Sequence, residues 1–470
     1  MSAELEVLRK ALKKGVNLSP EALSFLLSLK GENLDELLDL LRDKVVVDLR
    51  DLMPLVERAE GIPKGGIESD LSVLLRPVDL GVSGAPDEFV RFIRSRFEGL
   101  RSLLLRRIDL EPIPIAELRA SATRNGDNLL VIGMVLDKAT MRDRSIRITL
   151  EDETGSISVL FKKESRYWEI ADKIPVDSVI AVRGTYMNGK IFAESLTLPE
   201  VSEEEVKSGF HEGKVALVSD VHIGSKYFNE RAFEKFIRWL GSEGARDVRY
   251  LVICGDLVDG IGVYPNQEEE LRITDVYKQF EYAGAILSRV PNHVKLIYVP
   301  GNHEPVRQAE PQPEVPEDYL EILREAKPDM IHLPNPAMVS IGGVRIMLYH
   351  GRSLNAIMKH IPGLQPVTPN TVVEAMSWML RLRSLAPIYG EHPISPEERD
   401  WLVLLEVPNV LHTGHIHVYG VGEHRGVKLI NSGTFENETP YIRSLGIEVT
   451  VGRVPVLDLK NLSVEVMNFS

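Results

Sequence analysis

Two shortages in the sequence limit the class of protein that it can encode. Cys254 is the only cysteine, which excludes a disulfide framework and any metal site made of several thiolates. The longest apolar runs are about ten residues, roughly half the length of a membrane-spanning helix. The amino-terminal residues are amphipathic and lack the apolar core of a secretion signal. We therefore expect a soluble cytoplasmic protein that is not secreted and contacts no membrane.

Basic residues are also fewer than acidic ones. The chain has 55 Lys+Arg against 69 Asp+Glu, a formal net charge of −14 at pH 7. A protein that holds nucleic-acid phosphates by itself usually carries a basic face. If this chain acts on a polymer rich in phosphate, metal ions or a partner subunit must supply the positive field.

In other respects the composition is that of a globular protein, with 44% hydrophobic and 26% charged residues. At about 150 residues per domain, the 470 residues suggest about three domains. The patterning predicts a small helical domain, a linker with a basic helix, a β-barrel and an α/β domain. Their predicted bounds are 1–60, 61–110, 111–200 and 201–470.

The basic helix is predicted over residues 87–107, where arginines outnumber acids. Such a helix could meet DNA or an acidic partner. A solvated helix face explains the same run and is the more common case. The arginines concerned are Arg91, Arg94, Arg96, Arg101, Arg106 and Arg107.

Residues 126–199 have the strand pattern of a small barrel. Apolar residues alternate with polar ones through 146–150 and 157–161, as in half-buried strands. Asn188-Gly189 between two later apolar runs predicts a tight hairpin. Three strands, a helix and two further strands is the order of an OB-fold barrel. The strands hold few aromatic rings for stacking on nucleic-acid bases, which favours a structural or subunit-binding role. These rings are Phe161, Tyr186 and Phe192.

The carboxyl-terminal domain contains five apolar runs that are each followed by the same kinds of polar residue. Short β-branched runs alternate with amphipathic helices such as 229–241, which is typical of a layered α/β domain. Parallel strands in such a sheet present ligand-binding residues at their carboxyl ends. The residues that follow the runs are Asp220 and His222, Asp256, Asn302 and His303, His350, and His415 and His417.

The chemistry of these side chains points to divalent metal ions. Carboxylates, amides and imidazoles bind borderline metals such as Mn²⁺, Fe²⁺ or Zn²⁺. In D-x-H and H-x-H, the spacing puts both side chains on one side of an extended strand end. Seven donors are too many for one tetrahedral ion and suit two ions about 3.5–4 Å apart that share a carboxylate. One such motif alone means little, but six of the twelve histidines lie at or next to these strand ends, His412 being the least certain.

The motif series D-x-H, G-D-x-x-D, G-N-H-E, H-G and G-H-x-H resembles that of the calcineurin-like metallophosphoesterases over roughly 211–437. The sequence around the motifs, such as PGNHEPVRQAEPQP and LHTGHIHVYG, is similar to that of the small subunits of the archaeal family D DNA polymerases. The resemblance implies a helical amino-terminal unit, an OB-fold barrel and a calcineurin-like α/β sandwich. This multidomain α/β and β architecture agrees with the division predicted from the patterning.

The resemblance also implies roles for individual residues. His303 would face the scissile phosphate and protonate or stabilise the leaving oxygen, with Glu304 as its orienting partner. Glu304 stands where an aspartate is common, and Asp259 would only hold its loop. One metal would be bound by Asp220, His222, Asp256 and His417. Asp256 would bridge to a second metal, which would be completed by Asn302, His350 and His415.

The function implied is that of the small, proofreading subunit of a heteromeric replicative DNA polymerase. Such a subunit is a 3′→5′ exonuclease that hydrolyses single-stranded or mismatched 3′ DNA ends with a hydroxide bridging two divalent ions. Mn²⁺ is the first choice of ion, with Fe²⁺, Zn²⁺ or Mg²⁺ as alternatives. Polymerisation would need a large catalytic subunit, in a heterodimer or higher heteromer associated with the nucleoid. A non-catalytic scaffold of the same architecture and a phosphatase of smaller phosphoesters remain open as alternatives.

Overall fold

The computed structural model describes residues 71–120, 126–206 and 212–470. The small helical domain predicted over 1–60 lies outside the described residues. Among those described, no helix combines the length and the apolar character needed to cross a bilayer.

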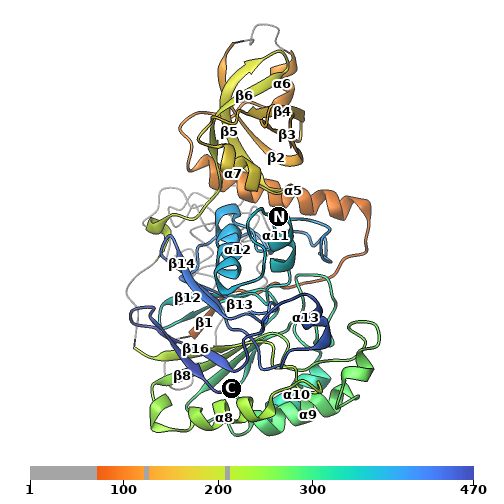
Figure 1. Cartoon of the computed structure of the whole chain (residues 1–470), viewed down its shortest axis with the longest axis vertical. Helices are drawn as coiled ribbons and strands as arrows, with labels where there is room; N and C mark the ends of the chain where they lie inside the picture. The colour runs from red at the N-terminus through yellow and green to blue at the C-terminus, as the bar shows by residue number, and fades with distance from the viewer. Residues whose placement is uncertain (1–70, 121–125, 207–211) are drawn as a thin grey trace, which may run out of the picture. The chain divides into compact units, whose positions relative to one another are not determined.

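Five strands between residues 128 and 197 close into a barrel (Figure 1). The neighbour order is β2-β3-β4-β6-β5, with β4 and β6 parallel and the other pairs antiparallel. A short helix, α7 (Trp168–Lys173), separates β4 from β5 in the chain, so three strands, a helix and two strands follow one another as predicted. The strands are β2 (Asn128–Thr140), β3 (Ile146–Asp152), β4 (Gly155–Phe161), β5 (Val179–Met187) and β6 (Lys190–Thr197).

The alternation that predicted these strands is the alternation of the barrel core. Ile146, Ile148 and Leu150 of β3 are all fully buried, and the residues between them are not. Asn188 and Gly189 both have positive φ values, 50° and 75°, as a two-residue hairpin of this kind requires. The period-two pattern and the hairpin are therefore confirmed.

The barrel's aromatic rings belong mainly to its core. Phe161 is fully buried, Tyr186 is 8% exposed and Phe192 is half-buried. Bases that stack on a protein need exposed ring faces. These three rings therefore do not form a stacking platform for nucleic acid.

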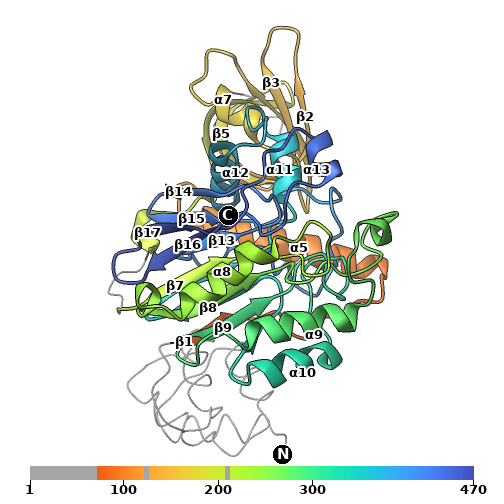
Figure 2. The same ribbon diagram turned by 60° about the horizontal axis from the view of Figure 1, so that its bottom comes forward.

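Two six-stranded sheets form the carboxyl-terminal lobe (Figures 1 and 2). The first has the order β10-β9-β8-β7-β16-β17 and comprises β7 (Lys214–Val218), β8 (Val248–Cys254), β9 (Lys295–Val299), β10 (Ile331–His332), β16 (Arg453–Asp458) and β17 (Val464–Asn468). The second has the order β1-β11-β12-β13-β15-β14 and comprises β1 (Leu71–Leu75), β11 (Ala337–Ile341), β12 (Val344–Leu348), β13 (Val410–Thr413), β14 (Gly420–His424) and β15 (Val427–Asn431).

The sheets pack face to face over a dry apolar layer. Side chains such as Val252 of β8 and Ile346 of β12 belong to this layer and are fully buried. The outer face of the first sheet is covered by α8 (Glu230–Leu240), α9 (Val276–Leu287) and α10 (Glu317–Ala326), as Figure 2 shows. The outer face of the second is covered by α11 (Leu354–His360) and α12 (Pro369–Leu382). The lobe is thus a mixed α/β sandwich.

Two sequence-based assignments differ from the structure. The sequence predicts a linker over residues 61–86, but Leu71–Leu75 form β1, which pairs antiparallel with β11. This strand is mostly exposed and has no long apolar run, because it lies at a sheet edge. The alternating apolar residues of the run IEVTV at 447–451 also predict a strand. This run forms only an isolated bridge, between Val451 and Thr434, because it follows closely on α13 (Pro440–Ser444) and gains no neighbouring strand.

The basic helix exists as α5 (Pro86–Leu105), and most of the arginines predicted for it pair with acids or carbonyls. Arg91 pairs with Asp87 and Arg94 with Glu153, both pairs being exposed. Arg96 is different: only 1% of its side chain is exposed, and its Nε lies 2.5 Å from Asp400 of the carboxyl-terminal lobe. Further along the same face of the helix, Leu100, Leu103 and Leu104 pack against the barrel.

We expect Arg96→Leu to lower the stability of the folded chain by about 3–5 kcal/mol, because it strands a buried carboxylate without its partner. Arg91→Leu removes an exposed pair and should cost under about 1 kcal/mol. Thermal unfolding of the two variants beside the wild type measures the difference. An equally small shift for both variants would show that Arg96 does not stabilise this junction.

Candidate metal centre

The two sheets bring their strand ends to one place. Asp220, Asp256 and Asn302 follow β7, β8 and β9 of the first sheet by two or three residues. His350 and His415 follow β12 and β13 of the second sheet in the same way. All five runs picked out in the sequence are strands, and the polar residues after them meet across the two sheets.

The backbone at the centre adopts an uncommon conformation. Five of the seven predicted metal ligands have positive φ, between 52° and 68°. Non-glycine residues rarely adopt this left-handed region, and clusters of them are typical of functional sites. The sharp bends turn side chains from successive positions inward rather than along the strands. These residues are Asp220, His222, Asp256, His415 and His417.

Two glycines are required because the carboxylates occupy the space that a side chain would need. A Cβ added at Gly301 would lie 2.2 Å from Oδ1 of Asp256, and one at Gly414 would lie 2.4 Å from Oδ2 of Asp220. Both distances are far below van der Waals contact. The strand-end glycines thus allow the backbone to approach both buried acids.

The donor atoms of the seven predicted ligands gather into two groups. In the first, Nε2 of His222 and Nε2 of His417 face each other at 3.2 Å, and Asp220 Oδ1 lies 3.4 Å from His417 Nε2. In the second, His350 Nε2 lies 3.2 Å from Asp256 Oδ2 and 3.1 Å from Asn302 Oδ1. Ligand atoms of Asp256, His350 and His415 all lie within 4.8 Å of one another.

Asp256 belongs to both groups. Besides its contact with His350, its Oδ2 lies 3.9 Å from Nε2 of His222 in the first group. It is 2% exposed, and Asp220 is fully buried. A carboxylate shared in this way is the arrangement expected of the bridging ligand.

Outer partners fix the orientation of the imidazole rings. His222 bonds through Nδ1 to Asp259 at 2.8 Å, and His350 through Nδ1 to the carbonyl of Cys254 at 3.0 Å. His415 bonds through Nε2 to the side-chain amide of Asn355 at 2.9 Å. Each ring therefore keeps its other nitrogen for the centre, as rings of metal-binding histidines do.

The electrostatics of the buried groups match this arrangement. Burial alone would raise the pKa of Asp220, but the hydrogen bond and charge of His417 lower its pKa to about 2. Burial would lower the pKa of His350, yet the Asp256 carboxylate raises that pKa to about 10. His415 faces the positive His350, and burial together with this charge lowers its pKa to about 3. The acids are thus ionised deep in the protein and favour positive charge beside them.

The donor set fits divalent ions. Two imidazole nitrogens that face each other at 3.2 Å beside a carboxylate are well arranged to share a cation. Carboxylate, amide and imidazole donors suit Mn²⁺, Fe²⁺ or Zn²⁺, and no thiolate is among them. The residues brought together are the seven predicted ones: Asp220, His222, Asp256, Asn302, His350, His415 and His417.

His303 lies at the rim of this centre. Its side chain is 15% exposed, and its ring centroid lies 4.6 Å from that of His222. Its Nδ1 lies 2.8 Å from the backbone carbonyl oxygen of Asp259, which accepts a hydrogen bond from that nitrogen. Burial would lower the pKa of His303, but the charge of Asp256 and the hydrogen bond to Asp259 raise it.

Glu304 has different partners from the one expected. Its carboxylate accepts hydrogen bonds from the backbone N–H groups of Asp256, Leu257 and Gly301 and from the hydroxyl of Tyr298. The residue that orients the His303 ring is Asp259, which also orients His222. Glu304 ties the strand-end loops of β8 and β9 together, and its longer side chain can reach all four donors.

Some functional residues escaped the sequence analysis. Asn355 holds His415 from the start of α11, and Ser219 donates a hydrogen bond to Asp220 and contacts Ser432. Both are common polar residues without a distinctive spacing, so no sequence signal marks them. His412 is not a ligand: it is buried in β13, contacts Ser432, and has its pKa lowered to about 3 by burial.

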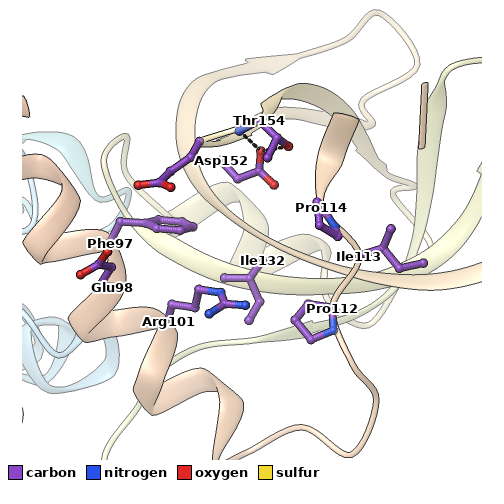
Figure 3. A pocket seen from close by; sticks show the side chains of 10 residues that line it. Phe97, Glu98, Arg101, Pro112, Ile113, Pro114, Ile132, Asp152 and Thr154 are labelled. Atoms are coloured by element: carbon purple, nitrogen blue, oxygen red, sulfur yellow. Dashed lines mark hydrogen bonds between the residues drawn. The ribbon is translucent and has the colours of Figure 1, made fainter. Parts of the chain in front are cut away.

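A separate pocket of about 220 Å³ lies between α5 and the barrel (Figure 3). Arg101 and Phe97 from the helix and Ile132 from the barrel are among its lining residues. Asp152 there accepts a hydrogen bond from the backbone of Thr154. The lining contains no histidine, so this pocket plays no part in the metal centre.

Comparisons with known proteins show the family to which the chain belongs. The family model for the B-subunits of DNA polymerases alpha and epsilon matches residues 215–419, which hold most of the two sheets. A solved archaeal phosphodiesterase covers 54% of this chain and 98% of its own at 16% identity. Its TM-score of 0.28 is too low to support an argument about the fold.

The most similar curated relatives cover most of the chain. The DNA polymerase II small subunit of Methanothermobacter thermautotrophicus is 40% identical over 80% of this chain and 78% of its own. The DNA polymerase II small subunit of Archaeoglobus fulgidus is 35% identical over 96% of this chain and 95% of its own. The protein is therefore of the polymerase accessory-subunit class. It belongs to the family of archaeal DNA polymerase II small subunits.

We expect Glu304→Ala to destabilise the folded chain by at least about 2 kcal/mol, because it leaves several buried donors without an acceptor. Glu281→Ala on the exposed surface of α9 is the matched control, and we expect little change there. Chemical denaturation of both variants measures the loss. A Glu304→Ala protein as stable as the control would contradict the tying role of this carboxylate.

Proposed function

We propose that this chain is the proofreading subunit of a heteromeric replicative DNA polymerase and acts as a 3′→5′ exonuclease. The observation that carries the proposal is a buried carboxylate, Asp256, shared by two groups of metal donors with His303 beside them. Hydrolysis forms a bond from a water oxygen to phosphorus and breaks the bond from phosphorus to the 3′ oxygen. The products are a 5′-mononucleotide and a strand shortened by one nucleotide.

The seven donors would hold two divalent ions, Mn²⁺ being the first choice and Fe²⁺, Zn²⁺ or Mg²⁺ the alternatives. Such ions, when bound, lower the pKa of water and stabilise charge on the phosphate. Asp220, His222, Asp256 and His417 would bind one of them. Asp256, Asn302, His350 and His415 would bind the other.

The local charge favours an anionic substrate in spite of the net charge of −14. Two divalent ions contribute +4, and the carboxylates of Asp220 and Asp256 contribute −2. The centre would then have a net charge of +2. Because the surrounding protein is acidic, phosphodiesters would be attracted to this one place rather than held along a basic face.

His303 is placed to handle the proton of the leaving group. Its Nδ1 is engaged with the Asp259 carbonyl, so Nε2 is the nitrogen available to the substrate. Transfer of a proton from Nε2 to the departing 3′ oxygen is general acid catalysis. Asp259 is a positioning residue, since it acts through the two histidines that it holds.

The rest of the chain suits assembly. We interpret the closed barrel as an OB-fold whose aromatic rings are too buried for base stacking, and the carboxyl-terminal lobe as a calcineurin-like α/β sandwich. The relatives are named as small subunits, which implies a large catalytic subunit as partner in a heterodimer or higher heteromer. DNA with a free 3′ end is the expected substrate.

The first test is the release of 5′-mononucleotides from single-stranded and 3′-mismatched DNA with Mn²⁺. We expect His303→Ala to lower kcat by about 10²–10⁴-fold while Mn²⁺ binding persists, since this residue acts as an acid and not as a ligand. His360→Ala, at an exposed histidine paired with Glu391, should retain full activity. Activity in neither wild type nor variant would favour a scaffold, and a preference for monoesters would favour a phosphatase.

The second test concerns the ions. After treatment with EDTA and reloading, we expect two Mn²⁺ per wild-type chain and a loss of at least one with Asp256→Asn, because that carboxylate serves both groups. Elemental analysis of the desalted proteins gives the stoichiometry. Asp247→Asn, at an exposed acid, is the control. Equal metal content in the Asp256→Asn and wild-type proteins would rule out the shared ligand.

A further inference from the structure

The loop that follows Asp259 has a rigid base. Two fully buried glutamines hold its backbone. Gln279 of α9 accepts a hydrogen bond from the N–H of Gly260 at 2.8 Å and donates to the carbonyl of Gly260 at 3.0 Å. Gln267 donates to the carbonyl of Asp259 at 2.8 Å and accepts from the N–H of Val263 at 2.8 Å. Buried side-chain amides that satisfy backbone groups in this way fix the position of a loop.

The same loop lies directly against His303. A Cβ added at Gly260 would be 2.0 Å from the carbonyl oxygen of His303, so the two backbones are in close contact. Asp259, at the start of the loop, also binds the His303 ring. The loop and the proposed acid are therefore held in one fixed relation.

Tyr264 projects from this loop beside the acid. Its ring centroid lies 6.2 Å from that of His303, with an angle of 63° between the rings. Its hydroxyl donates to Glu270 at 2.9 Å, which holds the ring in place. The residue is 38% exposed, and Ile261 in the same loop is 43% exposed. The ring is thus held in place, partly exposed, next to the proposed acid.

We propose that the Tyr264 ring stacks on the base of the penultimate nucleotide of the DNA strand. This inference rests on the proposed exonuclease function. His303 serves the leaving 3′ oxygen, and after cleavage that oxygen stays with the penultimate nucleotide. A ring beside His303 is therefore on the side of the penultimate base, whereas the terminal nucleotide leaves with the phosphate.

Stacking on Tyr264 suits an enzyme that removes any nucleotide. Every base has a π-face, so stacking on an aromatic side chain tolerates all sequences. The base can reach the ring only after it leaves the stack of a duplex, and this separation costs least next to a mismatch or in a single strand. The tyrosine thus acts as a specificity-determining residue that favours frayed 3′ ends.

The test compares Tyr264→Ala and Tyr264→Phe in the full chain bound to its large subunit, without nucleotides for polymerisation. Three oligonucleotides serve as substrates. One is intact, one lacks the penultimate base and one lacks the terminal base. We expect Tyr264→Ala to raise KM for the intact strand roughly tenfold, with little change in kcat. Tyr264→Phe keeps the ring but loses the hydrogen bond to Glu270, so its KM should lie between those of the wild type and Tyr264→Ala. Tyr277→Ala removes another exposed tyrosine, which packs on Tyr319, and is the control.

The decisive comparison is the penultimate abasic strand. With that base absent, the wild type should show the same rise in KM, and Tyr264→Ala should add nothing further. The terminal abasic strand should remain sensitive to Tyr264→Ala. Equal loss on all three strands, or no loss on any, would overturn the stacking role while leaving the exonuclease proposal intact. Absence of hydrolysis by the wild type would instead contradict the proposed function.

A second readout is independent of hydrolysis. The measurement uses His303→Ala with Mn²⁺ bound, because this variant should hydrolyse DNA slowly while it keeps its ions. 2-Aminopurine at the penultimate position should lose fluorescence when the His303→Ala complex binds the strand, because a stacked base is quenched. Adding Tyr264→Ala should lessen this quenching, and 2-aminopurine at the terminal position should respond equally in both proteins. Equal penultimate quenching in both proteins would contradict stacking on Tyr264.

Discussion

The structure depends on one buried carboxylate, Asp256, that reaches across two sheets. It follows β8 of the first sheet and lies 3.2 Å from His350, which follows β12 of the second. An ionised acid with 2% exposure persists only where opposite charge or hydrogen-bond donors surround it. The apolar layer between the sheets sets their separation, so the packing of residues in this layer, such as Val252 and Ile346, decides whether the donors meet at all.

A second layer of contacts keeps this arrangement rigid. Asp259 orients two histidines, and Glu304 accepts from the backbone on both neighbouring loops. The strained left-handed residues at the centre are stable because these contacts over-determine their conformation. The same rigidity extends through Gln279 and Gln267 to the loop that carries Tyr264. The proposed metal ligands, the proposed acid and the proposed stacking ring are thus parts of one hydrogen-bonded framework.

The net negative charge of the chain does not conflict with binding of a phosphate substrate, because we propose that the substrate is held at the buried centre and not on the protein surface. The α5 arginines that could have formed a basic stripe pair instead with Asp87, Glu153 and Asp400, so this helix contributes to cohesion. Phe161 and Tyr186 support the barrel core rather than bind bases. The attraction for phosphate that we propose would then be concentrated at the metal centre, and a partner subunit would supply any wider grip on DNA.

The sequence by itself determined the barrel strands, the hairpin at Asn188-Gly189, α8 and the strands that precede the seven proposed metal donors. Each of these depends on local periodicity or on a residue type with few alternatives. It predicted a linker where Leu71–Leu75 form a strand through pairing with β11. It also named Glu304 as the residue that orients His303, a role that Asp259 has in the structure. Only the tertiary structure decided which nitrogen of each ring faces inward, that Asn355 and Ser219 support the ligands, and that Tyr264 lies beside His303. These contacts join residues far apart in the chain, and the packing of whole sheets and loops brings them together.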